Sequence, residues 1–244
     1  MKLRNLLSAA IVLAAAPLAN AQADEGWDWG VTPYVWAASI STDLREDAPP
    51  VGNESDFSDI ISKIDMAFMG HVEGQGDDFG MFGDILYLSM ADGRTGNFAQ
   101  TDADLDASVF ELAAVWAPGE VRNQGFEVFG GLRHIIVDFN LEIDPNAALL
   151  NTWNVGIDQS FSDAMLGARY KGAINDKWGY SLRADGSWGD TEGTYSTSVI
   201  FVYNTDGGGA WNFGYRYMDT ELAVKTTSIS LQLHGPVIGY TFKF

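Results

Sequence analysis

The last nine residues, Pro236-Val237-Ile238-Gly239-Tyr240-Thr241-Phe242-Lys243-Phe244, decide how the rest of the chain is interpreted. Every second residue from Ile238 to Phe244 is large and apolar, whereas the positions between them are small or polar. This alternation predicts a β-strand with one aromatic face. Soluble chains usually end on polar, frayed residues, so an aromatic terminal residue favours a strand that faces lipid.

The whole-chain composition agrees with a membrane barrel. The 244 residues are 46% hydrophobic and 19% charged, which fits one domain and excludes a disordered chain. No run of about 18 apolar residues follows the N-terminal segment, which excludes a helical membrane protein. Mean hydropathy is only -0.05, as expected where alternating strands conceal their apolar face. The 14 Phe, 8 Trp, 9 Tyr and 27 Gly residues fit the same class.

Charge and cysteine content exclude several functions. A formal net charge of -19 argues against nucleic acid or an anionic surface as a partner, since phosphate binding needs clustered Lys and Arg. The absence of cysteine excludes a disulfide scaffold, thiolate metal sites and a lipid-modified N-terminal cysteine. We expect no cofactor.

Residues 1–23 have the pattern of a cleaved secretory signal peptide. Lys2 and Arg4 form a basic start, and an apolar run too short to span a bilayer extends from Leu6 to Leu18. Small residues then offer cleavage after Ala21 or after Ala23. Residues 24–244 are predicted to form the barrel domain.

The mature chain alternates strand-like runs with turn clusters. The prediction is an all-β, antiparallel, up-and-down transmembrane barrel of about ten strands, with eight or twelve as alternatives. The strands are predicted at residues 27–41, 65–75, 79–90, 104–117, 125–140, 158–172, 177–190, 194–204, 210–220 and 226–244.

The connections alternate between short and long. Short turns at 76–78, 118–124, 175–176 and 206–209 are assigned to the periplasmic side, with both chain ends. Longer connections are expected near 42–64, 91–103 and 141–157. Phe57, Ile60, Ile61 and Ile64 in the first of these are spaced as in a short amphipathic helix, which would cover the barrel rim or dock a partner.

The last strand contains a change of parity. Ile229, Leu231 and Leu233 are odd-numbered apolar positions, whereas the apolar positions after Gly235-Pro236 are even-numbered. A β-bulge at Gly235-Pro236 is predicted, because one inserted residue would keep both sets on the lipid face; a turn there is the alternative.

Side-chain parity separates a lipid face from an interior. The predicted lipid-facing aromatic residues are Trp178, Tyr180, Trp211, Phe213, Tyr215, Tyr240, Phe242 and Phe244. The predicted lumen-facing polar residues are Glu73, Glu111, Asp163, Arg169, Lys171, Arg183, Asp185 and Arg216, with His71 and Lys243 on the same parity and Asp84, Glu127 and Arg133 on strands that are apolar on both faces. These charges would either pair in a bridged core or line a narrow water-filled path.

Catalytic and metal sites are not indicated. His71, His134 and His234 are the only histidines, none lies in a recognisable motif, and no Gly-x-Ser-x-Gly is present, so we predict that the protein is not an enzyme. Asp102, Asp104 and Asp106 lack the glycine and distal glutamate of an EF-hand loop. We interpret them as a solvated acidic rim, with divalent-cation bridging to lipopolysaccharide as the alternative.

Several segments resemble known outer-membrane proteins. Tyr240-Thr241-Phe242-Lys243-Phe244 is similar to the C-terminal signature of bacterial outer-membrane β-barrels, which implies recognition by their barrel assembly machinery. The runs at 29–36, 57–60 and 80–87, together with Gly235-Pro236, resemble small proteobacterial outer-membrane barrels without assigned activity. This resemblance implies the fold and a location in the outer membrane after export through the periplasm, and supplies no catalytic residues.

The leading functional hypothesis is an integral outer-membrane barrel, either a narrow passive channel for ions or small solutes or a mainly structural protein. Its expected partners are membrane lipid and lipopolysaccharide. Any pore is expected to prefer cations, because the mature chain is strongly acidic. The alternatives are a barrel enzyme that modifies envelope lipids and a soluble lipocalin-like binder, whose apolar face would point inward.

Overall fold

The computed structural model describes residues 26–45, 53–55, 64–95, 99–119, 121–145, 152–224 and 227–244. The predicted signal peptide and all but the last residue of the predicted loop helix lie outside these ranges. Among the described residues, no helix is long and apolar enough to cross a membrane.

All regular elements of the described chain are β-strands. Their bounds are β1 (Asp28–Trp36), β2 (Ser39–Arg45), β3 (Asn53–Ser55), β4 (Ile64–Gln75), β5 (Phe79–Thr95), β6 (Ala99–Trp116), β7 (Gly125–Pro145), β8 (Trp153–Ala173), β9 (Trp178–Gly189), β10 (Gly193–Asn204), β11 (Ala210–Val224) and β12 (Thr227–Lys243).

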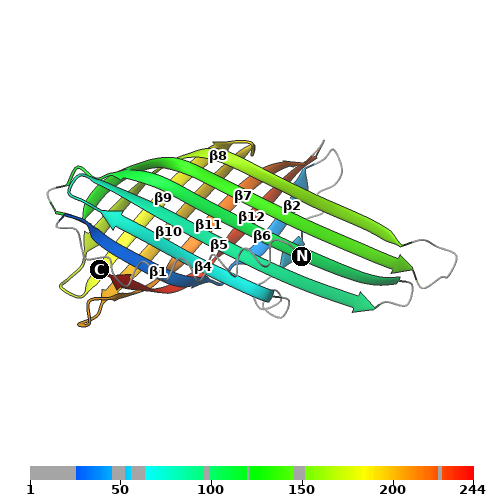
Figure 1. Cartoon of the computed structure of the whole chain (residues 1–244), viewed down its shortest axis with the longest axis horizontal. Coiled ribbons are helices and arrows are strands. Elements are labelled where there is room, and N and C mark those ends of the chain that lie inside the picture. Colours follow the sequence, from blue (N-terminus) through cyan, green and yellow to red (C-terminus); the bar gives the residue numbers. More distant parts are fainter. Residues whose placement is uncertain are drawn as a thin grey trace.

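Ten of these strands close into a barrel (Figure 1). The order is β1-β4-β5-β6-β7-β8-β9-β10-β11-β12, and β12 pairs back onto β1, with antiparallel pairing throughout. β2 pairs with the outer half of β12, and β3 pairs with the other edge of β2. The predicted fold class and the count of ten strands are therefore confirmed, since each predicted segment overlaps one wall strand. The first predicted segment, 27–41, covers β1 and reaches only the start of β2, so the predicted connection 42–64 was wrong in extent, because β2 continues to Arg45 and β3 lies within it.

Strands β5 to β8 continue well beyond the predicted ends, so the expected long connections at 91–103 and 141–157 were wrong in extent. Pairing continues through Ala91↔Asp104 on one side and Leu141↔Val155 on the other. These segments carry few apolar side chains that could face lipid. Backbone hydrogen bonding between strands does not require such side chains. The ladders therefore extend past the barrel wall as long hairpins (Figure 1).

The predicted bulge in the last strand was wrong. β12 pairs with β11 in one register from Ala210↔Thr241 to Val224↔Thr227, straight through Tyr215↔Pro236 and Arg216↔Gly235. Alternation is therefore unbroken, and the apolar parity changes because Leu231 and Leu233 face the interior. The prediction failed because it required every apolar side chain to face lipid, whereas the outer half of this barrel has an apolar interior.

The irregularity lies instead in the neighbouring strand. β1 and β2 pair with β12 in a common register, Trp36↔Val237 and Ser39↔His234, and are interrupted between them at Ala37-Ala38. The Ala37 N–H donates to the Pro236 carbonyl at 2.9 Å, and Pro236 has no N–H to return the bond. A Cβ at Gly235 would collide with the Ala37 carbonyl oxygen, so this close approach requires glycine.

The barrel wall has a seam between β2 and β4. The β1–β4 ladder runs from Asp28↔Gln75 to Pro33↔Gly70, and beyond it β2 pairs with β3 rather than with β4. The backbone N–H of Trp36, which would continue that ladder, donates to the thioether sulfur of Met69 at 3.1 Å. Within the described residues, the outer half of β4 therefore pairs only with β5.

Candidate functional site

The interior of the barrel is divided into a charged layer and an apolar chamber. The charged layer lies toward the short turns, and the chamber lies toward the extended hairpins. Both follow from strand alternation, because residues two apart on each strand point to the same side of the wall.

Arg133 on β7 is the centre of the charged layer. Its Nε and Nη2 donate to one Glu111 oxygen at 3.0 and 2.7 Å, and Nη2 also donates to Asp185 at 2.7 Å. Nη1 donates to Ser187 Oγ at 3.1 Å. The Arg133 side chain has no exposed surface and those of Glu111 and Asp185 are 1% and 0% exposed, so every charge is removed from water and satisfied by a partner.

Two further arginines complete this group. Arg183 donates to Glu111 at 2.8 Å and to Asp185 at 2.6 Å. Arg216 donates to Glu111 at 3.4 Å and to the Tyr34 hydroxyl at 3.3 Å. Glu111 therefore accepts from arginines on three different strands, β7, β9 and β11.

A second group lies closer to the short turns. Arg169 donates to Glu73 at 2.6 Å and to Glu127 at 2.6 Å, and Lys171 donates to Glu73 at 2.7 Å. His71 joins the two groups: its Nε2 is 3.4 Å from Glu73, and its Nδ1 is 3.1 Å from Asp84, which accepts from the Tyr34 hydroxyl at 2.7 Å. The charges thus form one network across the barrel.

Asp163 is held by neutral donors rather than by a cation. Thr191 donates to it from its backbone N at 3.1 Å and from Oγ1 at 2.5 Å, and Ser187 Oγ donates at 3.1 Å. Through Ser187 this carboxylate is joined to Arg133.

The structure places all eight predicted lumen-facing residues in this network. Asp84, Glu127 and Arg133, whose parity was ambiguous in the sequence, also belong to it. Lys243 instead lies exposed at the short-turn rim, where it donates to Asn204 at 2.8 Å. β7 carries apolar residues on both faces, so the sequence did not show which face is polar. Arg133 was therefore not recognised as the centre of the charged layer.

Aromatic rings fill the space around the charges. Phe82 and Phe129 pack edge to face with centroids 5.2 Å apart, and the Arg183 guanidinium lies 5.0 and 4.9 Å from the two centroids. Ala113, Val115 and Met165 complete this cluster. Phe82 and Phe129 are each 1% exposed, so side chains occupy this cross-section of the barrel.

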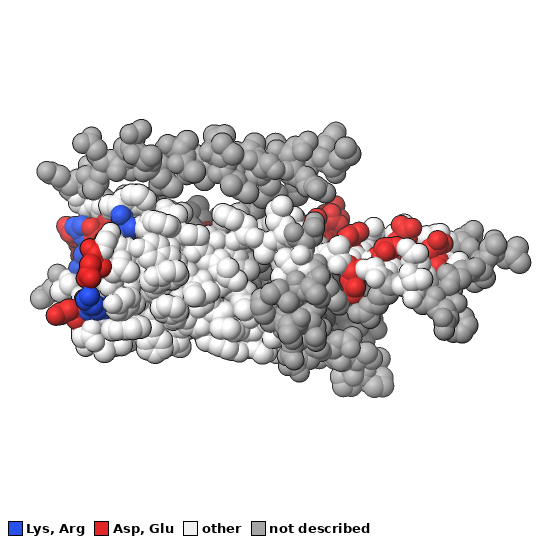
Figure 2. All heavy atoms as spheres, turned by 90° about the horizontal axis from the view of Figure 1, so that it is seen from below, with Lys and Arg blue, Asp and Glu red and all other residues white. Residues whose placement is uncertain are grey.

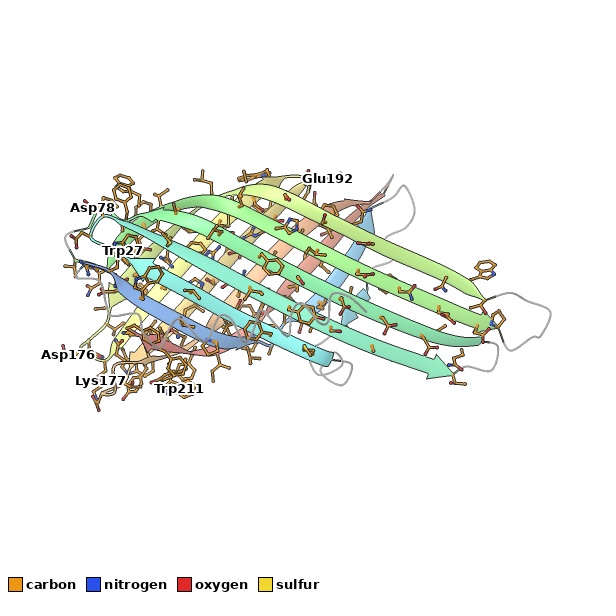
Figure 3. The ribbon with its side chains drawn as sticks, in the orientation of Figure 1. Trp27, Asp78, Asp176, Lys177, Glu192 and Trp211 are labelled. Carbon is orange, nitrogen blue, oxygen red and sulfur yellow. The ribbon has the colours of Figure 1, made fainter. Side chains whose placement is uncertain are left out.

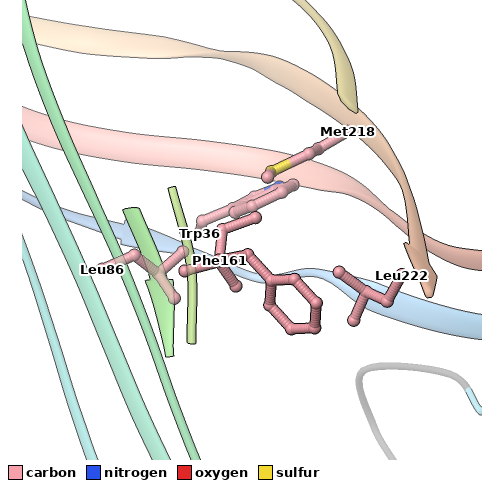
Figure 4. Packing of buried hydrophobic residues seen from close by; sticks show 6 residues of the cluster. Trp36, Leu86, Phe161, Met218 and Leu222 are labelled. Carbon is pink, nitrogen blue, oxygen red and sulfur yellow. The ribbon is translucent and has the colours of Figure 1, made fainter. Parts of the chain in front are cut away.

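The outer chamber is a cavity of about 270 Å³ on the other side of this layer. A cluster of buried apolar side chains from five strands surrounds part of it. Figure 4 shows this cluster from close by. We define the outer chamber by its lining residues: Trp36, Ile40, Leu86, Leu88, Met90, Leu105, Ala107, Ser108, Val109, Ile135, Val137, Met218, Thr220, Leu222, Leu231 and Leu233. Sequence reasoning missed it, although the odd-numbered leucines of the last strand were the available signal.

Trp36 is shared by the two compartments. Its indole lines the outer chamber and also packs against Arg216, whose Cζ is 5.0 Å from the ring centroid. The side chains of Trp36 and Thr220 are buried, and among the described residues neither Trp36 Nε1 nor Thr220 Oγ1 has a hydrogen-bond partner.

The outer wall presents the predicted aromatic residues. Trp178, Trp211, Phe213, Tyr215, Phe242 and Phe244 are exposed there, and Tyr180 and Tyr240 are partly exposed. Figure 2 shows an uncharged band between charges at the short-turn end and acidic side chains on the extended hairpins. Trp27 and Trp211 lie at the short-turn end with Asp78, Asp176 and Lys177 (Figure 3). An apolar exterior is the opposite of what a lipocalin-like binder requires.

The short-turn rim is held by surface ion pairs. Arg122 donates to Asp77 and, at 3.4 Å, to Asp28. The hydrogen bond to Asp77 raises the pKa of the Arg122 guanidinium above its ordinary value.

Histidines and acidic runs show little that is suited to catalysis or metal binding. His134 Nδ1 lies 2.9 Å from Ser162 Oγ on the outer wall, and His234 Nδ1 lies 2.8 Å from the Tyr215 hydroxyl. Asp102, Asp104 and Asp106 point outward from the extended part of β6. No group of three or more His, Asp or Glu side chains placed to hold a metal ion occurs in the part of the chain that is described.

Comparison with solved structures places the fold. The outer membrane protease OmpT from Escherichia coli matches with a TM-score of 0.53 and 10% identity, covering 89% of this chain and 97% of OmpT. The fold is that of an outer-membrane β-barrel. This outer-membrane barrel also matches the translocator domain of the autotransporter NalP from Neisseria meningitidis (TM-score 0.46, 11% identity, 98% and 96% of the two chains). Ail from Yersinia pestis matches with a TM-score of 0.35 and 10% identity over 89% and 99% of the two chains. No protein-family model and no curated protein sequence matches the chain.

Proposed function

We propose that the protein is an integral membrane barrel of the bacterial outer membrane whose lumen is closed to ions, a mainly structural membrane protein rather than an open passive channel. The observation that supports this is the complete burial of Arg133 between Glu111 and Asp185. A hydrated ion would have to displace these side chains in order to pass.

The energetics favour a closed lumen. Removing one partner of a buried ion pair costs about 3–5 kcal/mol, because the remaining charge is left unpaired. Opening a path beside Arg133 would leave Glu111 and Asp185 without this partner and would incur a cost of this kind. It would also separate Arg183 from the rings of Phe82 and Phe129, on which it packs. Thermal opening of the network is therefore rare.

The outer surface supports the membrane location. Leu112, Leu132 and Leu166 are 63%, 62% and 61% exposed on the outside of neighbouring strands. Such a surface is stable in lipid and costly in water. The charged rim at the short turns and the acidic hairpins at the other end fit the two aqueous sides of a membrane.

Conductance across a planar lipid bilayer tests the proposal. We expect the wild-type protein to insert without discrete current steps and the Arg133→Ala variant, which leaves a void in the charged layer, to conduct. Arg122→Ala at the exposed rim is the matched control and should be silent. Heat-modifiable migration on gels establishes that each variant is a folded barrel. Regular current steps from the wild type would contradict the closed lumen and favour the channel.

A further inference from the structure

The lining of the outer chamber selects against charge. Its residues come from β1, β2, β5, β6, β7, β11 and β12, and none of them carries a charged side chain. Transfer of an unpaired ion or a strongly hydrated solute into such a lining is unfavourable by several kcal/mol. An uncharged, largely apolar occupant is the chemical class that fits.

The size of the chamber limits the occupant. An engineered apolar cavity of about 150 Å³ accepts benzene, so the volume of about 270 Å³ here suits a molecule somewhat larger than one aromatic ring. A long acyl chain would exceed it. Ligand sites commonly begin at about 300 Å³, so the chamber lies at the lower limit of that range.

Two polar atoms in the lining give the site a second requirement. Trp36 Nε1 can only donate a hydrogen bond, whereas Thr220 Oγ1 can donate or accept one. Trp36 and Thr220 are each 2% exposed, and neither polar atom has a partner among the described residues. Neither atom has accessible surface in this structure, so an occupant reaches one of them when the indole or the threonine side chain turns toward the chamber. An oxygen that reaches one of them gains a hydrogen bond in an apolar setting.

We propose that the outer chamber binds a small, uncharged, mainly apolar molecule that carries one oxygen able to hydrogen-bond, the class to which aromatic alcohols belong. Trp36 Nε1 or Thr220 Oγ1 recognises the oxygen, and the leucines and Met218 line the space for the apolar body. The charged layer forms the floor of the site, so the ligand does not pass through to the short-turn end.

Calorimetric titration of the purified barrel in detergent tests the proposal with three probes of one shape. 2-Naphthol is uncharged and carries the oxygen, naphthalene lacks the oxygen, and naphthalene-2-sulfonate carries a charge. We expect saturable one-to-one binding of 2-naphthol, weaker binding of naphthalene and no binding of the sulfonate. Tight binding of the sulfonate would overturn the proposal.

Variants separate the chamber from the detergent micelle. Ala107→Phe fills the chamber and should abolish binding of 2-naphthol, and Val137→Phe provides a second filling variant if the first fails to fold. The same heat in the wild type and in a folded filling variant would mean partition into the micelle and would overturn the site.

The polar atoms are tested with near-isosteric replacements. Combining Trp36→Phe with Thr220→Val should weaken 2-naphthol binding by about tenfold, the size of one hydrogen bond, and leave naphthalene binding unchanged. Equal affinity of the wild type and this variant for 2-naphthol would overturn the role of these atoms. Because the readout is binding rather than current, it does not depend on whether the lumen conducts.

Discussion

Arg133 and Glu111 lie directly opposite each other in the β6–β7 ladder, and the guanidinium donates twice to a single oxygen of that carboxylate. The ion pair therefore joins two neighbouring wall strands, and Arg133 extends it to Asp185 on β9. These interior ion pairs thus hold together β6, β7 and β9, in addition to the backbone hydrogen bonds of the wall.

Replacing Arg133 should destabilise the barrel strongly. We expect Arg133→Ala to lower the free energy of unfolding by about 3–5 kcal/mol, because Glu111 and Asp185 lose a buried partner. Urea titration of the refolded protein in lipid vesicles measures this quantity. Arg122→Ala, at the solvent-exposed rim, should leave the midpoint almost unchanged, and equal effects of the two substitutions would contradict the structural role of the network.

The opened barrel should prefer cations. Arg133→Ala removes one positive charge from a layer that retains Glu111, Asp185 and Asp163, so the local field becomes more negative. The reversal potential of this variant in a potassium chloride gradient measures the preference. Anion selectivity would show that Arg169, Lys171, Arg183 and Arg216 dominate.

An arginine on the outer wall should be costly. Leu182 is 43% exposed on β9, between Tyr170 and Val199 on the neighbouring strands. We expect Leu182→Arg to cost roughly 2–4 kcal/mol if the residue lies near the middle of the membrane. Leu182→Met is the control for altered shape. Folding equilibria in lipid vesicles measure the free energy of unfolding of both variants. If Leu182→Arg does not lower this free energy, the surface around Leu182 faces water rather than lipid.

The close approach at Gly235 should not tolerate a methyl group. Gly235→Ala forces a Cβ into the Ala37 carbonyl, and overpacking of this kind costs about 1–3 kcal/mol. Gly207→Ala is a matched control, because a Cβ there meets nothing within 4 Å. Chemical denaturation of both variants compares them directly. Similar stabilities of the two variants would contradict the prediction, because they would mean that the Ala37-Ala38 backbone can move away from residue 235 without cost.

The Ser162–His134 contact should have no catalytic role. No carboxylate is placed to orient His134 among the described contacts of that histidine, whereas a nucleophilic pair needs such a third group. We expect Ser162→Ala to leave the lipid products of reconstituted vesicles the same as those of the wild type. Products that form with the wild type and vanish in this variant would support the enzyme alternative.

Strand alternation made most of the wall predictable. Large apolar residues such as Leu166 and Tyr170 mark the lipid face of β8, so the opposite parity, with Asp163 and Arg169, could be assigned to the interior without knowledge of the strand partners. β7 lacked this contrast because Phe129 and Ile135 share the inner face with Arg133.

Two parts of the interior could not be predicted for physical reasons. The pairing of Arg169 with Glu73 joins residues 96 positions apart, and it depends on the relative stagger of several strands. The outer chamber depends on Leu231 and Leu233 facing inward, and alternation alone does not tell an apolar interior from a lipid face.

The position of Trp36 makes the two compartments thermodynamically dependent on each other. One indole ring contacts Arg216 and also lines the outer chamber, so an occupant that shifts the ring changes the free energy of the charged layer. Linkage is reciprocal: any perturbation of the charged layer that displaces Arg216 must alter the affinity of the outer chamber by the same coupling free energy. A tilt of this single side chain would therefore couple occupancy of the outer chamber to the stability of the charged layer without a moving domain.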